Sequence, residues 1–122
     1  MKDLSPQLQN QIAQYQQLQQ QLQVLASQRV QLEAKLREID GTLEVFNKIS
    51  GDTPIYKSIG MLLVRQDDRD ALKKELEEHK ETLTIRVKSL QKQEKSFAER
   101  YEGLGEKIQA ALGGPPATPE GG

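Results

Sequence analysis

The chain has 122 residues, a formal net charge of -1, and 29% charged residues. Its apolar share is about 40% when Gly is counted and Tyr is not, below the roughly 45 to 50% of ordinary globular domains, so a large compact core is not expected. It contains no cysteine, which excludes disulfide bonds and thiolate chemistry. Neither a signal-peptide pattern nor about 18 consecutive apolar residues occurs, so we expect a cytoplasmic protein without a membrane partner.

Charge is balanced along the chain as well as in total. Residues 1–50 contain five acids and five bases, and residues 66–112 contain eleven acids and ten bases. Binding to a nucleic-acid backbone depends on clustered Lys and Arg that neutralise many phosphates. Nucleic acid is therefore not an expected partner.

The first expected element is a helix over about residues 5–49. Ser5 is a good N-cap, and Pro6 suits the first helical position. Apolar residues then recur at alternating spacings of three and four, and ten of twelve seam positions are apolar, with Gln11 and Arg29 as the exceptions. Spacing sustained over this length predicts the seam of a coiled coil.

Residues 54–66, PIYKSIGMLLVRQ, predict a β-hairpin with Gly60-Met61 as its turn and Ile59 paired with Leu62. Such a hairpin is marginal alone in water, and its edges carry unpaired backbone groups. Leaving its apolar side chains in water would forgo roughly 10 to 20 kcal/mol, comparable with the net stability of a whole domain. We therefore expect hairpins from several subunits to join into one sheet or β-barrel. The expected assembly residues are Ile55, Tyr56, Ile59, Met61, Leu62, Leu63 and Val64.

A second helix is expected over about residues 68–112, with nine of eleven seam positions apolar and Lys80 and Glu94 as the exceptions. The remaining residues, 113–122, are rich in Gly and Pro and are expected to be disordered. The predicted fold class is mainly α with a small β element. Two long helices form an antiparallel coiled coil, joined by one hairpin, within a single subunit over residues 1–112.

Each helix has a charged residue within its seam. If the chain reverses at the hairpin turn, Arg29 lies opposite Glu94 across the coiled coil. As a pair they would fix the register more than they would add stability. Equally, both long side chains could extend to solvent.

The stretch PIYKSIGMLLVRQDDRDALKKELEEHKETLTIRVKSLQKQE, with IYKSIG and LLV at its centre, resembles the β class of prefoldin subunits. A single hairpin between the helices matches this class, because the α class has two. The resemblance implies a hexamer of two α and four β subunits with a double β-barrel body. It also implies ATP-independent capture of unfolded client proteins, delivery to a group II chaperonin, and an archaeal origin.

In an antiparallel pair, both chain termini lie together at the end away from the hairpin, which is the expected client-binding tip. Gly103 and Gly105 weaken the helix there by roughly 1 kcal/mol each relative to Ala, so its last turns are expected to fray. Weak contacts from several such tips add up on one flexible chain. The alternative is that these side chains simply complete the coiled-coil core. The candidates are Leu4, Leu8, Ile12, Tyr15, Leu104, Ile108, Ala111 and Leu112.

No catalytic site is expected. The chain has no P-loop motif for a nucleotide, and its one histidine, His79, has no cysteine or second histidine with which to share a metal, so no cofactor is expected. The alternative to a chaperone subunit is a structural coiled-coil scaffold or adaptor without client-holding activity.

Overall fold

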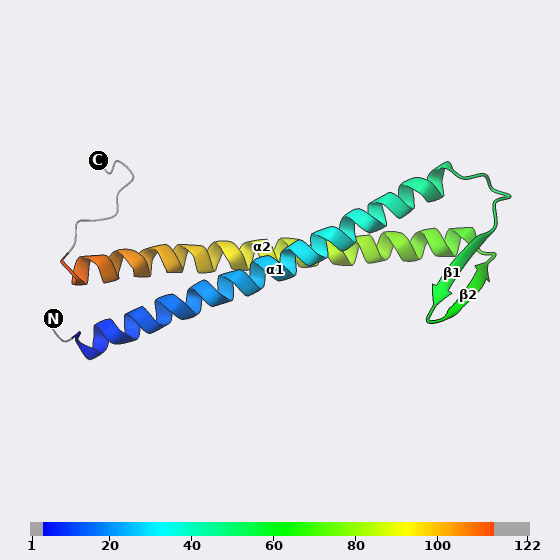
Figure 1. Ribbon diagram of the computed structural model, residues 1–122. Coiled ribbons are helices and arrows are strands. Elements are labelled where there is room, and N and C mark those ends of the chain that lie inside the picture. The colour runs from blue at the N-terminus through cyan, green and yellow to red at the C-terminus, as the bar shows by residue number, and fades with distance from the viewer. Residues whose placement is uncertain (1–3, 114–122) are drawn as a thin grey trace. The chain divides into compact units, whose positions relative to one another are not determined.

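The computed structural model describes residues 4–113. Two long helices are joined by a two-stranded antiparallel hairpin, which confirms the predicted fold class (Figure 1). Apart from Gly113, the predicted disordered tail lies outside the described residues. Within residues 4–113, neither helix is apolar enough over a sufficient length to cross a membrane. The elements are α1 (Pro6–Lys48), β1 (Ile55–Ile59), β2 (Leu62–Gln66) and α2 (Arg69–Ala111).

Side-chain caps and a glycine define the helix ends. The Ser5 hydroxyl accepts a hydrogen bond of 3.1 Å from the backbone N–H of Leu8, so it caps α1 as the sequence predicts. Asp68 caps α2 in the same way, with its carboxylate accepting from the Ala71 N–H at 3.0 Å. After α2, Gly113 adopts a φ of 81°, a conformation that favours glycine beyond a helix C-terminus.

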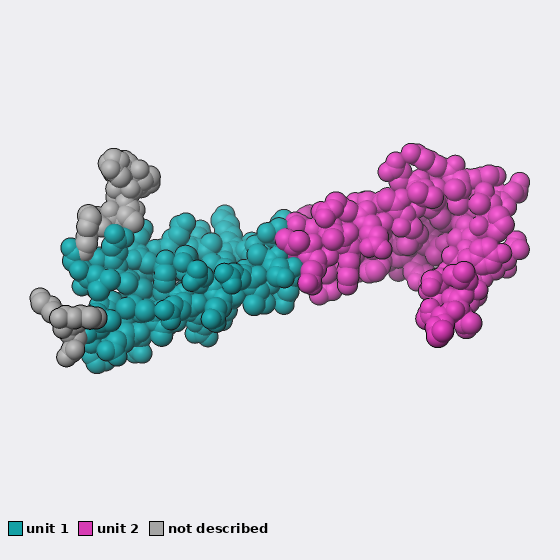
Figure 2. All heavy atoms as spheres, in the orientation of Figure 1, with its two compact units in different colours: residues 1–29, 89–122 teal, residues 30–88 magenta. Residues whose placement is uncertain are grey.

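The chain divides into two compact units, residues 1–29 with 89–122 and residues 30–88 (Figure 2). The first unit, whose described parts are residues 4–29 and 89–113, pairs the beginning of α1 with the end of α2. The second pairs the rest of the two helices and carries the hairpin. The twelve predicted seam positions of α1 run through both units, and all are buried or half-buried. They are Leu8, Gln11, Tyr15, Leu18, Leu22, Leu25, Arg29, Leu32, Leu36, Ile39, Leu43 and Phe46.

In the second unit the core consists of aliphatic side chains from both helices. Lys80, a charged position of the predicted seam, is exposed, and its Nζ pairs with Asp40 Oδ1 at 2.8 Å. Burial of each large aliphatic side chain stabilises the pairing by about 1.5 to 3 kcal/mol. The buried residues are Leu32, Ile39, Leu43, Leu83 and Val87.

The hairpin has the predicted register, with Ile59 opposite Leu62. Gly60 has a φ of 59°, and no other residue among those described in the hairpin has a positive φ. Positive φ at the first central residue alone is the pattern of a type II′ turn, whose twist matches that of the strands. The hairpin is also tied to α2, because Lys57 Nζ donates to Glu75 Oε1 at 2.6 Å.

Candidate functional site

The hairpin exposes apolar side chains on both of its faces. Successive residues of a strand point to opposite faces, so Leu62 and Leu63 lie on different sides of the sheet, and they are 66% and 74% exposed. Met61 at the turn is fully exposed. Among residues 4–113, each strand pairs with the other strand alone, so each also has an unpaired edge. Of the seven expected assembly residues, only Ile55 is half-buried, and the others are exposed.

A largely apolar hollow of about 340 Å³ lies in the second unit beside β1. The guanidinium of Arg69 lies 5.2 Å from the ring centroid of Phe46, one of the residues that line it. No sequence pattern indicated this hollow, because its lining comes from both helices and the hairpin. The apolar residues that line it are Val45, Phe46, Ile49, Ile55, Tyr56, Leu72 and Leu76.

In the first unit, the expected client-binding residues differ in how accessible they are. Leu8 is only 8% exposed and belongs to the core. Ala111 and Leu112, at the end of α2, are exposed. Ile12, which lies outside the seam, is half-buried. The half-buried members are Leu4, Ile12, Tyr15, Leu104 and Ile108.

Two stacked tyrosines join the helices within this unit. The ring centroids of Tyr15 and Tyr101 are 4.1 Å apart, with 13° between the ring planes. A hydrogen bond with the Tyr101 side chain raises the pKa of Tyr15 above its ordinary value, and burial acts in the same direction. The stack therefore favours neutral Tyr15.

The fraying expected at the two glycines of α2 is not present, because the helix continues through both to Ala111. The two glycines have different surroundings. A Cβ on Gly105 would lie 2.9 Å from Cε1 of Tyr15, closer than real Cβ contacts, whereas a Cβ on Gly103 would meet nothing within 4 Å. Gly105 thus makes room for the Tyr15 ring.

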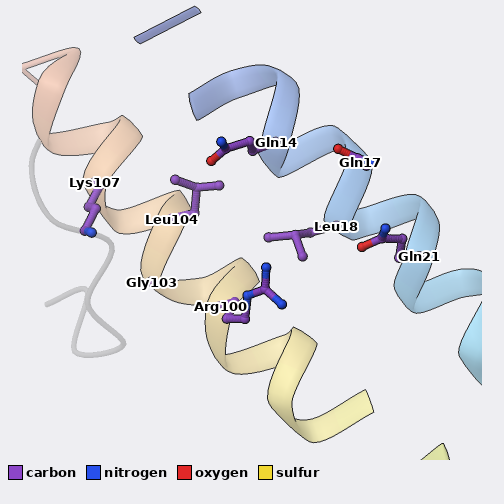
Figure 3. Close-up of a pocket in the computed structure, with 8 residues that line it drawn as sticks. All are labelled: Gln14, Gln17, Leu18, Gln21, Arg100, Gly103, Leu104 and Lys107. Atoms are coloured by element: carbon purple, nitrogen blue, oxygen red, sulfur yellow. The ribbon is translucent and has the colours of Figure 1, made fainter. Parts of the chain in front are cut away.

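A groove lies between the helices of the first unit, with a volume of about 560 Å³ (Figure 3). The side chains of Leu18 and Leu104 extend into the space between the helices. Amide side chains line it on α1, and two cations and a glycine line it on α2. We call this the amide groove, and its lining is Gln14, Gln17, Leu18, Gln21, Arg100, Gly103, Leu104 and Lys107.

Arg29 and Glu94 meet in the first unit, where Arg29 Nε donates to Glu94 Oε1 at 2.5 Å. Their side chains are 26% and 19% exposed, so most of both is removed from water. The structure therefore pairs Arg29 with Glu94 across the coiled coil. This is the first of the two interpretations of the sequence, the other being that both side chains extend to solvent. Among residues 4–113, no group of three His, Asp or Glu residues is arranged to hold a metal ion.

Comparisons with known proteins give a consistent result. The family model described as "Prefoldin subunit" matches residues 9–114. "Prefoldin subunit beta" of Archaeoglobus fulgidus is 47% identical over 112 residues, 92% of this chain and 96% of that protein. The protein of the same name from Pyrococcus furiosus is 39% identical over 117 residues, 96% of this chain and 99% of that protein. The crystal structure of the prefoldin beta subunit from Thermococcus strain KS-1 superimposes with a TM-score of 0.83 and 34% identity, covering 94% of this chain and 100% of that one.

Proposed function

Because the chain belongs to the prefoldin subunit family, as its sequence predicted, we propose that it is a β-class subunit of an ATP-independent molecular chaperone. In this role it captures unfolded polypeptides in the cytoplasm and transfers them to a group II chaperonin. It acts by binding rather than by catalysis. The observation that carries the proposal is the group of exposed and half-buried apolar side chains where α1 begins and α2 ends.

The hairpin supports assembly with other subunits. Its exposed side chains would each gain about 1.5 to 3 kcal/mol on burial, and its two unpaired edges can extend a sheet with strands from neighbouring chains. We propose that it joins α-class and other β-class hairpins in a β-barrel, within a hexamer of two α and four β subunits.

Client capture uses the helix ends of the first unit. Leu112 is exposed, and the half-buried side chains beside it become accessible when the last turns of the helices separate. Each contact with a client is weak, but several subunits acting on one flexible chain raise the effective concentration of binding groups. Reversible weak contacts also permit release to a chaperonin without nucleotide hydrolysis.

The test is to remove the helix ends without disturbing the hairpin. A variant lacking residues 1–11 and 105–122 is mixed with an α-class subunit, and its assembly is measured by analytical ultracentrifugation. The hexamer should form, whereas light scattering should show that it no longer suppresses aggregation of a chemically unfolded protein. Deletion of 114–122 alone is the matched control and should retain full suppression.

A hexamer that still suppresses aggregation after loss of both helix ends would overturn client capture by these residues. Absence of suppression by the full-length hexamer would instead favour the alternative, a structural scaffold or adaptor.

A further inference from the structure

The amide groove of the first unit has a chemistry that the apolar helix ends do not share. Gln14, Gln17 and Gln21 lie on one side of α1, since residues three and four apart on a helix are neighbours. A glutamine amide offers two N–H donors and a carbonyl acceptor, which complement the one N–H and one C=O of each backbone peptide unit. This row can therefore hydrogen-bond an extended polypeptide whatever its side chains.

The opposite wall carries positive charge. Arg100 and Lys107 are the only charged residues in the lining. Within the part of the chain that the structure describes, neither forms an ion pair with a carboxylate. Arg100 instead lies over the ring of Phe97, 5.1 Å from its centroid, which leaves its N–H groups able to bind an acceptor.

The dimensions suit a short extended segment. Arg100 and Lys107 are seven residues apart, which is about 10 Å along a helix and equals about three residues of extended chain. Gly103 lies between them, and the space where its Cβ would project is empty to 4 Å. Between the polar walls, half-buried Leu104 offers apolar surface, whereas Leu18 is only 7% exposed and belongs to the core of this unit (Figure 3).

We infer that the amide groove binds extended segments of unfolded polypeptide in which carboxylate side chains flank apolar ones. This inference rests on the proposed function and names the class of client segment that the β subunit favours. The glutamines bind the backbone, half-buried Leu104 contacts apolar side chains, and the two cations select for acidic residues over basic ones.

The experiment uses the full chain assembled with its α-class subunit and three fluorescent peptides. Each peptide has the same run of Leu and Val, flanked by Asp, by Asn or by Lys. Fluorescence anisotropy should give the tightest binding for the Asp peptide and the weakest for the Lys peptide. Added salt should reduce the difference, because exposed charges are screened.

Two sets of variants test the groove itself. Arg100→Gln with Lys107→Gln should weaken the Asp peptide about three- to tenfold, to the level of the Asn peptide, since exposed charge pairs contribute modestly. Lys92→Gln with Lys95→Gln removes the same charge from the same helix outside the groove lining, and should leave the preference unchanged.

Blocking the groove provides a second test that does not change its charge. Gly103→Gln places a side chain in the open space and should weaken all three peptides. Gly41→Gln is its matched control, because Gly41 is also helical with nothing within 4 Å of its Cβ position, but lies in the other unit. Equal affinity for the Asp and Lys peptides, or groove variants that bind like their controls, would overturn the inference. If these variants also suppress aggregation normally while the truncation above does not, the proposed function stands without the amide groove.

Discussion

The hairpin and the paired helix ends both offer apolar surface, but they offer it in different ways. On the hairpin of the single subunit the surface is regular and open, since Leu63 is 74% exposed and each strand has a free backbone edge among the described residues. At the helix ends Leu8 is buried, and several neighbouring side chains are half-buried beside a groove lined with amides. The amount of exposed apolar surface therefore does not by itself distinguish an assembly site from a client site.

The two kinds of site differ in whether they require a partner backbone in a fixed register. A strand edge requires a partner strand in one register, so the hairpin suits a folded neighbour that is the same in every assembly. Glutamine side chains and partly covered leucines impose no register, so the helix ends suit a segment of variable sequence. Four experiments would break or sharpen this comparison.

The largest effect is expected from a charge on the hairpin. Leu63→Lys should raise the dissociation constant of the subunits by about 10- to 100-fold per interface, because burial of one leucine contributes about 1.5 to 3 kcal/mol. Ile85→Lys is the control, since Ile85 is similarly exposed, at 60%, but lies on α2. Analytical ultracentrifugation of the mixture with the α-class subunit measures both. Equal dissociation by the two variants would contradict assembly through the hairpin.

Sequence reasoning could predict the hairpin closely because local rules determine it. Gly60 supplies the one positive φ that the turn needs, and the pairing of Ile59 with Leu62 follows from the turn's position. The coiled-coil seam was equally predictable, since its period persists along both helices. Combining the two predicted that Arg29 and Glu94 lie opposite each other, but it left open whether they pair or extend to solvent, and the structure shows them paired.

The helix ends were less predictable because their properties depend on contacts between helices outside the seam. Gly105 was interpreted as a weak point of α2, although it provides the space for Tyr15. The amide groove was missed for a similar reason: its polar lining residues, such as Gln17 and Arg100, follow no hydrophobic period. Only the pairing of the two helices brings them together.

The second experiment asks whether the helices of the first unit pair in a fixed register. Arg29→Leu or Glu94→Leu alone should reduce the free energy of unfolding by about 1 to 3 kcal/mol, because each leaves a charge largely removed from water without this partner. The double variant should recover most of that loss. Urea unfolding of all four proteins gives the coupling energy.

The pair Glu44 and Lys48 is the control for this cycle, since both side chains are about two-thirds or more exposed. Its coupling should be only about 0.3 to 0.5 kcal/mol. Additive losses at Arg29 and Glu94 would show that the pair does not fix the register.

The third experiment compares the two glycines of α2 in the first unit. Gly103→Ala should stabilise the protein by about 1 kcal/mol, because alanine favours the helix and the added Cβ has free space. Gly105→Ala brings the same helical gain but displaces the Tyr15 ring from its stack, so its net gain should be smaller or negative. Thermal unfolding measures the difference. Equal gains would mean that the tyrosine ring moves aside at no cost.

The smallest effect expected is a pH dependence of the tyrosine stack. Tyr15 has a raised pKa in the folded protein, so its neutral form is favoured there. The resulting stabilisation is complete below the ordinary tyrosine pKa of about 10 and is lost as the pH rises through that value and through the higher folded pKa. The stability advantage of the wild type over Tyr15→Phe, measured by urea unfolding, should therefore shrink above about pH 10.

Tyr101→Phe removes the hydrogen-bonding partner and is the companion variant for this measurement. It should abolish most of the pH dependence of stability that Tyr15 contributes, while keeping an aromatic ring in the stack. If the hydrogen bond holds the helix ends closed, client binding should also strengthen with pH over the same range in the wild type but not in Tyr15→Phe. A pH dependence that persists in both variants would place its origin outside the stack, and the helix ends would then lack the closure that sets them apart from the hairpin, whose apolar side chains are exposed in the single subunit.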